Sequence, residues 1–208
     1  MSESLRTFDQ QFGAATAARI SALISRINAL RPRAPGGATS FYLYEMSCCL
    51  QVGLLLAALH LCSTSLELFV RAKVALAARH AASGRYVVPK TSGALTYQER
   101  LEENRKLKLA DLLTHLELAG LFRKDDVAPT LDFYNGVRTP LAHGLIQRFT
   151  YGKPEATGYG LSSIISGLWG FTSQSELENF VEANAISQIE TAIGIMERNA
   201  QFRMIDDG

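Results

Sequence analysis

The sequence predicts an all-α protein that folds as an up-and-down helical bundle. Apolar residues recur at spacings of three and four along its longest segments, which is the repeat of an amphipathic helix. Alternation typical of a strand is weak and is confined to residues 148–162. Hydrophobic residues make up 47% of the 208 positions and charged residues 20%, which is enough apolar material for one sizeable core. We therefore expect one helical domain over residues 1–208, with its core at about 39–147 and extra helices at both ends.

The first expected helix covers residues 4–30. Its apolar positions follow one helical stripe, while charged residues occupy the other faces. The stripe consists of Leu5, Phe8, Phe12, Ala15, Ile20, Leu23, Ile24, Ile27 and Leu30. Residues 31–37 read Arg-Pro-Arg-Ala-Pro-Gly-Gly, and prolines and glycines in this density end a helix.

Residues 39–82 form the longest apolar segment. The run from Leu50 to Cys62 is shorter than the roughly 20 apolar residues of a membrane span, so we expect a buried core helix and no membrane association. Thr64-Ser-Leu-Glu67 is typical of a capping box that starts a second helix, or of a polar turn within one long helix. Because the apolar stripe continues beyond it, we favour a continuous or slightly bent helix. The end of this helix is basic, with Arg71, Lys73, Arg79 and Arg85.

Glycine, proline and serine predict a loop over residues 83–96. A helix with both charge signs follows from Tyr97. This helix, or a separate one after a short break, continues through several leucines to a stop at Gly120. The segment from Phe122 to Pro129 is expected to connect it to the helix that carries residues 131–145.

The end of the chain predicts one more long helix, over residues 174–202. Ser173 or Ser175 is expected to cap its start. Its apolar stripe consists of Leu177, Phe180, Val181, Ala185, Ile186, Ile189, Ala192, Ile193 and Met196. Before this helix, residues 148–162 predict a small hairpin or an irregular excursion.

Charge and cysteine content narrow the classes of function. The formal net charge of +1 argues against an extended nucleic-acid-binding surface, which needs a basic excess, although a local cleft is compatible with it. Cys48, Cys49 and Cys62 fit neither a disulfide framework nor zinc-ligand spacing, so we expect buried reduced thiols, no metal and no cofactor. The N-terminal residues show no apolar signal region, and we expect a cytoplasmic protein.

The most informative stretch is residues 131–145, which contains Arg138 and His143 among apolar residues. Cleavage of RNA without a metal needs a base for the 2′-hydroxyl proton and a fixed cation for the phosphorane oxygens. Imidazole suits the first task because its pKa lies near neutrality, and guanidinium suits the second because it stays charged and binds phosphate with a planar fork. The pair is therefore compatible with phosphodiester chemistry.

The spacing of this pair requires a bent segment. Five residues along a straight helix place two side chains about 140° apart, so Arg138 and His143 would not share a face. Pro140 is expected to kink the helix, or Thr139 to cap a helix that restarts at Pro140. In the alternative interpretation Arg138 pairs with a helix carboxylate and His143 packs near a helix end.

This stretch resembles the HEPN superfamily, whose signature is an arginine followed after four to six residues by a histidine on the last core helix. The resemblance implies a bundle of HEPN type, catalytic roles for Arg138 and His143, and a homodimer that pools both pairs in one cleft. It also implies supporting roles for Thr139, which stands where the family usually has asparagine, and for Glu67, an acidic residue near the pair. Leu145 stands where the toxin subgroup carries a tyrosine, which departs from that subgroup.

Two functions follow as expectations. The first is a metal-independent endoribonuclease that acts on RNA as a homodimer, in a toxin–antitoxin, antiviral or RNA-processing system, with an antitoxin or other protein as a further partner. The second is a HEPN-like helical module without catalysis, which binds a protein partner or a nucleotide.

Overall fold

The regular elements of the structure are helices. The computed structural model describes residues 13–80, 105–138 and 174–200, and within these ranges it contains no strand. The elements are α2 (Ala14–Leu30), η1 (Arg31–Arg33), α3 (Gly37–Gln51), α4 (Leu55–His80), α6 (Leu109–Leu118), α7 (Lys124–Phe133), η3 (Tyr134–Arg138) and α10 (Gln174–Asn199). The all-α prediction is confirmed. The hairpin expected at 148–162 lies outside the described residues.

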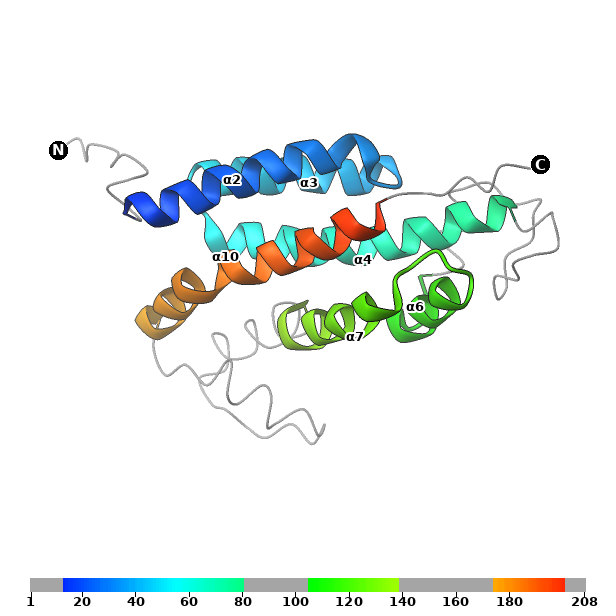
Figure 1. Ribbon diagram of the computed structural model, residues 1–208. Coiled ribbons are helices and arrows are strands. Elements are labelled where there is room, and N and C mark those ends of the chain that lie inside the picture. The colour runs from blue at the N-terminus through cyan, green and yellow to red at the C-terminus, as the bar shows by residue number, and fades with distance from the viewer. Residues whose placement is uncertain (1–12, 81–104, 139–173, 201–208) are drawn as a thin grey trace, which may run out of the picture.

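The helices lie in three layers, which Figure 1 shows from the side. Helices α2 and α3 form one outer layer, α4 and α10 the middle layer, and α6 and α7 the other outer layer. Helix α4 contacts α3, α6, α10 and η3, whereas α10 contacts α2, α4 and α7. The two middle helices therefore bring residues from both outer layers together.

The core follows the apolar stripes of the sequence. On α2, Ile20, Ile27 and Leu30 are fully buried, and on α10 the same holds for Ile189 and Ile193. Helix α10 runs to Asn199, within a few residues of the expected end, and it contacts both α2 and α4. Burial of such stripes, more than helix propensity, stabilises helices of this length.

Two expected helix boundaries need correction. The first helix does not run unbroken from residue 4, because Gly13 has a φ of 77°, outside the helical region, and α2 begins at Ala14. Similarly, the apolar run from Leu50 to Cys62 is not one buried helix. Gly53 has a φ of 75° and separates α3 from α4, so the run forms the corner of a helical hairpin. The sequence analysis missed this break because it relied on the apolar content of the run.

Helix α4 continues through its polar stretch, as expected. The hydroxyls of Ser63 and Thr64 both donate to the His60 carbonyl, at 2.7 and 3.2 Å, and the Ser65 hydroxyl donates to the Leu61 carbonyl at 2.8 Å. Because these hydroxyls bond to carbonyls of the preceding turn, none of them interrupts the helix. By length and composition residues Leu55–Ala75 are sufficient to cross a membrane, but 56% of this span is buried inside the protein, as in a central bundle helix.

The stop at Gly120 is confirmed, and the segment after it differs from expectation. Gly120 has a φ of 67°, and the amide of Leu121 donates to the Leu116 carbonyl at 2.8 Å, which closes the end of α6 as a Schellman motif. The next residues were expected to form only a connection. Instead α7 begins at Lys124, and Pro129 lies within it. Pro129 is the sixth residue of α7, beyond the first turn, so the helix lacks the hydrogen bond that an amide at this position would donate to the Asp125 carbonyl.

Candidate functional site

Arg138 lies at the end of a segment with unusual winding. Helix α7 passes at Phe133 into η3, a π-helical segment over Tyr134–Arg138. Val137 is buried and η3 contacts α4, so this segment is packed against the middle layer. Segments with π-helical winding are rare and are frequent at functional sites. The bend or helix cap that we expected at Thr139 or Pro140 lies outside the described residues.

Two of the predicted site residues meet. The Nη2 atom of Arg138 lies 3.0 Å from Oε2 of Glu67, which projects from the middle of α4. The Arg138 side chain is 30% exposed and that of Glu67 is 15% exposed. The Arg138 guanidinium also lies over the ring of Tyr134, 5.2 Å from its centroid. A carboxylate and an aromatic face thus hold the guanidinium while part of it stays open to water.

A second guanidinium binds the other oxygen of the same carboxylate. Arg71, one helical turn after Glu67, places its Nε and Nη2 atoms 3.0 and 2.9 Å from Glu67 Oε1. Its Nη1 and Nη2 atoms also donate to the Leu107 carbonyl, both at 3.4 Å, in the turn before α6. We call Glu67, Arg71 and Arg138 the Glu67 cluster. Its three side chains together carry an excess of one positive charge.

The outcome for the predicted site is therefore partial. The structure brings Glu67 and Arg138 together, whereas Thr139 and His143 lie outside the described residues. Arg71 was missed as a member, because the sequence analysis treated it only as part of a basic helix end. The available signal was its spacing of four from Glu67, which places the two side chains on one helix face.

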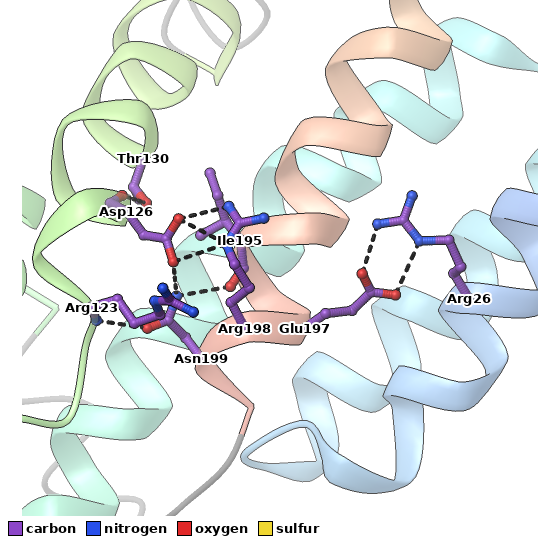
Figure 2. Close-up of polar contacts among 8 residues, drawn as sticks. All are labelled: Arg26, Arg123, Asp126, Thr130, Ile195, Glu197, Arg198 and Asn199. Atoms are coloured by element: carbon purple, nitrogen blue, oxygen red, sulfur yellow. Dashed lines mark hydrogen bonds and ion pairs between the residues drawn. The ribbon is translucent and has the colours of Figure 1, made fainter.

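A second polar cluster lies between α7 and α10 (Figure 2). Asp126 is 3% exposed and accepts hydrogen bonds from Arg198, with the shortest at 2.6 Å, and from the Asn199 amide at 2.7 Å. The Asn199 side-chain oxygen accepts from the backbone amide of Arg123 at 2.8 Å. We call Asp126, Arg198 and Asn199 the Asp126 cluster. Hydrogen bonding to Asp126 raises the pKa of Arg198 above its usual value.

The end of α10 is tied to both outer layers. Figure 2 shows that Glu197 and Arg198, which are neighbours in sequence, reach in opposite directions. Glu197 pairs with Arg26 of α2 at 2.6 Å, and Arg198 pairs with Asp126 of α7 at 2.6 Å. The two ion pairs connect α10 to α2 and to α7. They indicate a structural role for the Asp126 cluster.

Lys73, a residue of α4, contacts this end of α10. Its side chain is 1% exposed, and its ammonium donates to the backbone carbonyl of Asn199. A cation at the carboxyl end of a helix is favourable because the free carbonyls there are partly negative. Burial nevertheless disfavours the charged form and lowers the pKa of Lys73 to about 8. Lys73 therefore stabilises the helix end at the cost of desolvating an ammonium.

The Glu67 cluster contains guanidinium donors and one carboxylate. Within the described ranges, no group of three or more histidine, cysteine or acidic side chains is placed to hold a metal ion. The cysteines described there are free thiols, and burial raises the pKa of the fully buried Cys62. Two guanidiniums around one carboxylate instead offer donors and positive charge to an anion such as phosphate.

Comparisons of this chain with models of protein families, with curated proteins and with solved structures gave no match. The resemblance to HEPN proteins therefore rests on the Arg138–His143 motif and its helical setting.

Proposed function

We propose that this protein is a HEPN-type, metal-independent endoribonuclease that acts as a homodimer. In this mechanism the 2′-oxygen attacks the phosphorus and displaces the 5′-oxygen, Arg138 binds the scissile phosphate and stabilises the charge of the phosphorane, and His143 serves as the base for the 2′-hydroxyl proton or as the acid for the leaving 5′-oxygen. Glu67 orients Arg138, and Thr139 assists. The observation that carries the proposal is the 3.0 Å contact between Glu67 and Arg138, which joins an acidic residue of α4 to the arginine of the motif.

The environment of Arg138 supports a role in binding phosphate. A guanidinium stabilises a transition state best when it is held in place beforehand, because no reorganisation is then needed during the reaction. Glu67 and Tyr134 restrict the guanidinium from two sides. With 30% of the side chain exposed, a phosphate can approach the donors that Glu67 leaves free.

The proposal is tested by incubating the purified protein with a mixed RNA in the presence of a chelator. We expect cleavage by the wild type and a loss of about 100-fold or more for Arg138→Ala and for His143→Ala. His60→Ala is the matched control, because His60 is an exposed histidine on α4 and should leave the rate unchanged. The rate should follow a bell-shaped pH profile with one limb near neutrality. Cleavage that survives both site substitutions would exclude the assigned roles.

The contacts of Arg138 with Glu67 and Tyr134 are also compatible with a second, non-catalytic function. Glu67 and Tyr134 already occupy part of the Arg138 guanidinium, which is also what an arginine with a packing role would show. We therefore keep a non-catalytic helical module, which binds a protein partner or a nucleotide, as the alternative. Wild-type protein that cleaves none of a panel of RNAs and does not inhibit growth on expression would favour the module.

A further inference from the structure

The Glu67 carboxylate is divided between two guanidiniums, with Oε1 bound to Arg71 and Oε2 to Arg138. The three side chains differ in exposure. Those of Arg71 and Glu67 are 12% and 15% exposed, and that of Arg138 is 30% exposed. Arg71 is therefore the inner cation of the cluster, and Arg138 is the one that an incoming ligand meets first.

This division has an electrostatic consequence. A lone Glu67–Arg138 pair would be neutral as a whole, and its carboxylate would repel a phosphate placed on the far side of Arg138. Like charges in a partly buried site repel each other more strongly than in water, so the Glu67 carboxylate weakens the binding of an anion beside Arg138. Arg71 supplies a second positive charge at 2.9 Å from the same carboxylate and offsets its repulsion.

The position of Arg71 makes it suited to this task. Its contacts with Glu67 come from two nitrogens of one guanidinium to one oxygen, and its contacts with the Leu107 carbonyl hold the same group against the turn before α6. Arg71 is thus bound to Oε1 of the carboxylate, while Arg138 is bound to Oε2. It can compensate the charge of Glu67 without competing for the oxygen that holds Arg138.

We propose that Arg71 is a positioning residue that offsets the charge of Glu67, so that Glu67 fixes the orientation of Arg138 without cancelling its attraction for a phosphate group. The proposal rests on one part of the proposed function, the binding of phosphate by Arg138, and does not require that RNA is cleaved. It assigns Arg71 an electrostatic role that acts through Glu67 and not through contact with the ligand.

A double substitution separates an electrostatic role of Arg71 through Glu67 from direct contact of Arg71 with the ligand. The probe is a fluorescent DNA oligonucleotide of mixed sequence, which carries phosphates and has no 2′-hydroxyl to cleave. We expect Arg71→Gln to weaken its binding about tenfold at low salt, because Glu67 then repels the phosphate. In Glu67→Gln/Arg71→Gln the repelling charge is gone as well, and binding should return to within about threefold of the wild type. Arg71→Lys, which keeps the charge, should also bind within about threefold.

Arg26→Gln is the control for net charge, since it removes one arginine from an ion pair elsewhere, with Glu197, and should leave binding unchanged. Circular dichroism at the assay temperature verifies that each variant is folded. The proposal is overturned if Arg71→Gln binds like the wild type, if the double variant binds as weakly as Arg71→Gln, or if Arg26→Gln loses as much affinity. It is equally overturned if the folded wild type does not bind the oligonucleotide. Loss of the nuclease function alone would appear differently, as normal binding without RNA cleavage.

Discussion

Asp126 and Glu67 both bind arginine side chains, but the two clusters differ in charge balance. Asp126, with its side chain 4% exposed, pairs with Arg198 and with the neutral amide of Asn199. Glu67, with its side chain 15% exposed, pairs with both Arg71 and Arg138. The charged members of the Asp126 cluster cancel, whereas the Glu67 cluster keeps one positive charge among its three side chains. The first joins α7 to α10, and the second lies where η3 meets α4.

The difference separates a structural ion pair from a candidate site. A buried carboxylate is costly unless its charge is compensated and its lone pairs accept hydrogen bonds, and Asp126 meets both conditions. The side chains of the Glu67 cluster carry one more positive charge than negative, and this excess does not strengthen the ion pairs of the cluster. It attracts an anion instead. Substitutions should therefore act mainly on stability in the Asp126 cluster and mainly on ligand binding in the Glu67 cluster.

The largest effect on stability is expected from Asp126→Ala. This change leaves Arg198 and the buried Asn199 amide without their shared acceptor, and it should lower the free energy of unfolding by about 3 kcal/mol. Urea denaturation measures the change. Asp125→Ala is the matched control, because Asp125 lies in the same first turn of α7 but is exposed. Equal losses for the two variants would show that the effect comes from the helix end and not from the cluster.

A pH-dependent effect is expected from Lys73, the cation at the edge of the Asp126 cluster. Its pKa is about 8 in the folded protein against 10.5 for the ordinary side chain, so between these values the unfolded chain binds the extra proton. The contribution of Lys73 to the free energy of unfolding therefore rises with pH between these two pKa values. By linkage, it rises by roughly 2 kcal/mol from about pH 7.5 to about pH 9.5.

The effect of Lys73 is isolated by subtracting the stability of Lys73→Met, measured by urea denaturation at both pH values. Cys62 titrates in the opposite sense, because its folded pKa is raised, but both proteins contain it and its contribution cancels. Lys124→Met, at an exposed lysine of α7, should show no such pH-dependent difference. A difference between wild type and Lys73→Met that is constant with pH would contradict the prediction.

A smaller effect on stability is expected from Glu67→Gln. The amide retains the shape of the carboxylate and still accepts one hydrogen bond, and Arg138 can turn towards water, so the loss should be about 1 kcal/mol. Thermal unfolding followed by circular dichroism measures it. The comparison between the two clusters fails if Glu67→Gln destabilises the protein as much as Asp126→Ala does.

The smallest effect is expected from Arg19→Gln. Arg19 pairs with Glu190 at 2.7 Å on the surface, where the two side chains are 49% and 31% exposed. Exposed pairs contribute about 0.5 kcal/mol and are screened by salt. Urea denaturation at low and high salt should show a small loss that disappears in high salt. A loss above about 1 kcal/mol would mean that contacts between α2 and α10 depend on this pair more than its exposure indicates.

The agreement between sequence and structure is greatest where the signal is local. The stripe of α10, the stop at Gly120 and the continuity of α4 through Ser63–Ser65 all depend on residues within one or two turns of each other. The break at Gly53 was missed because a glycine in an apolar run is compatible with a helix, and only the reversal of the chain against α3 requires its positive φ.

By itself the sequence determined the helical class and most helix positions, and its resemblance to HEPN proteins predicted that Glu67 lies near Arg138. Only the tertiary structure decided that Arg71 shares the Glu67 carboxylate and that Asp126 is buried against Arg198 and Asn199. Helical periodicity repeats every 3.6 residues and is readable along the chain. The partner of a charged side chain depends instead on which helices pack together, and charges of suitable sign occur on nearly every helix of this protein.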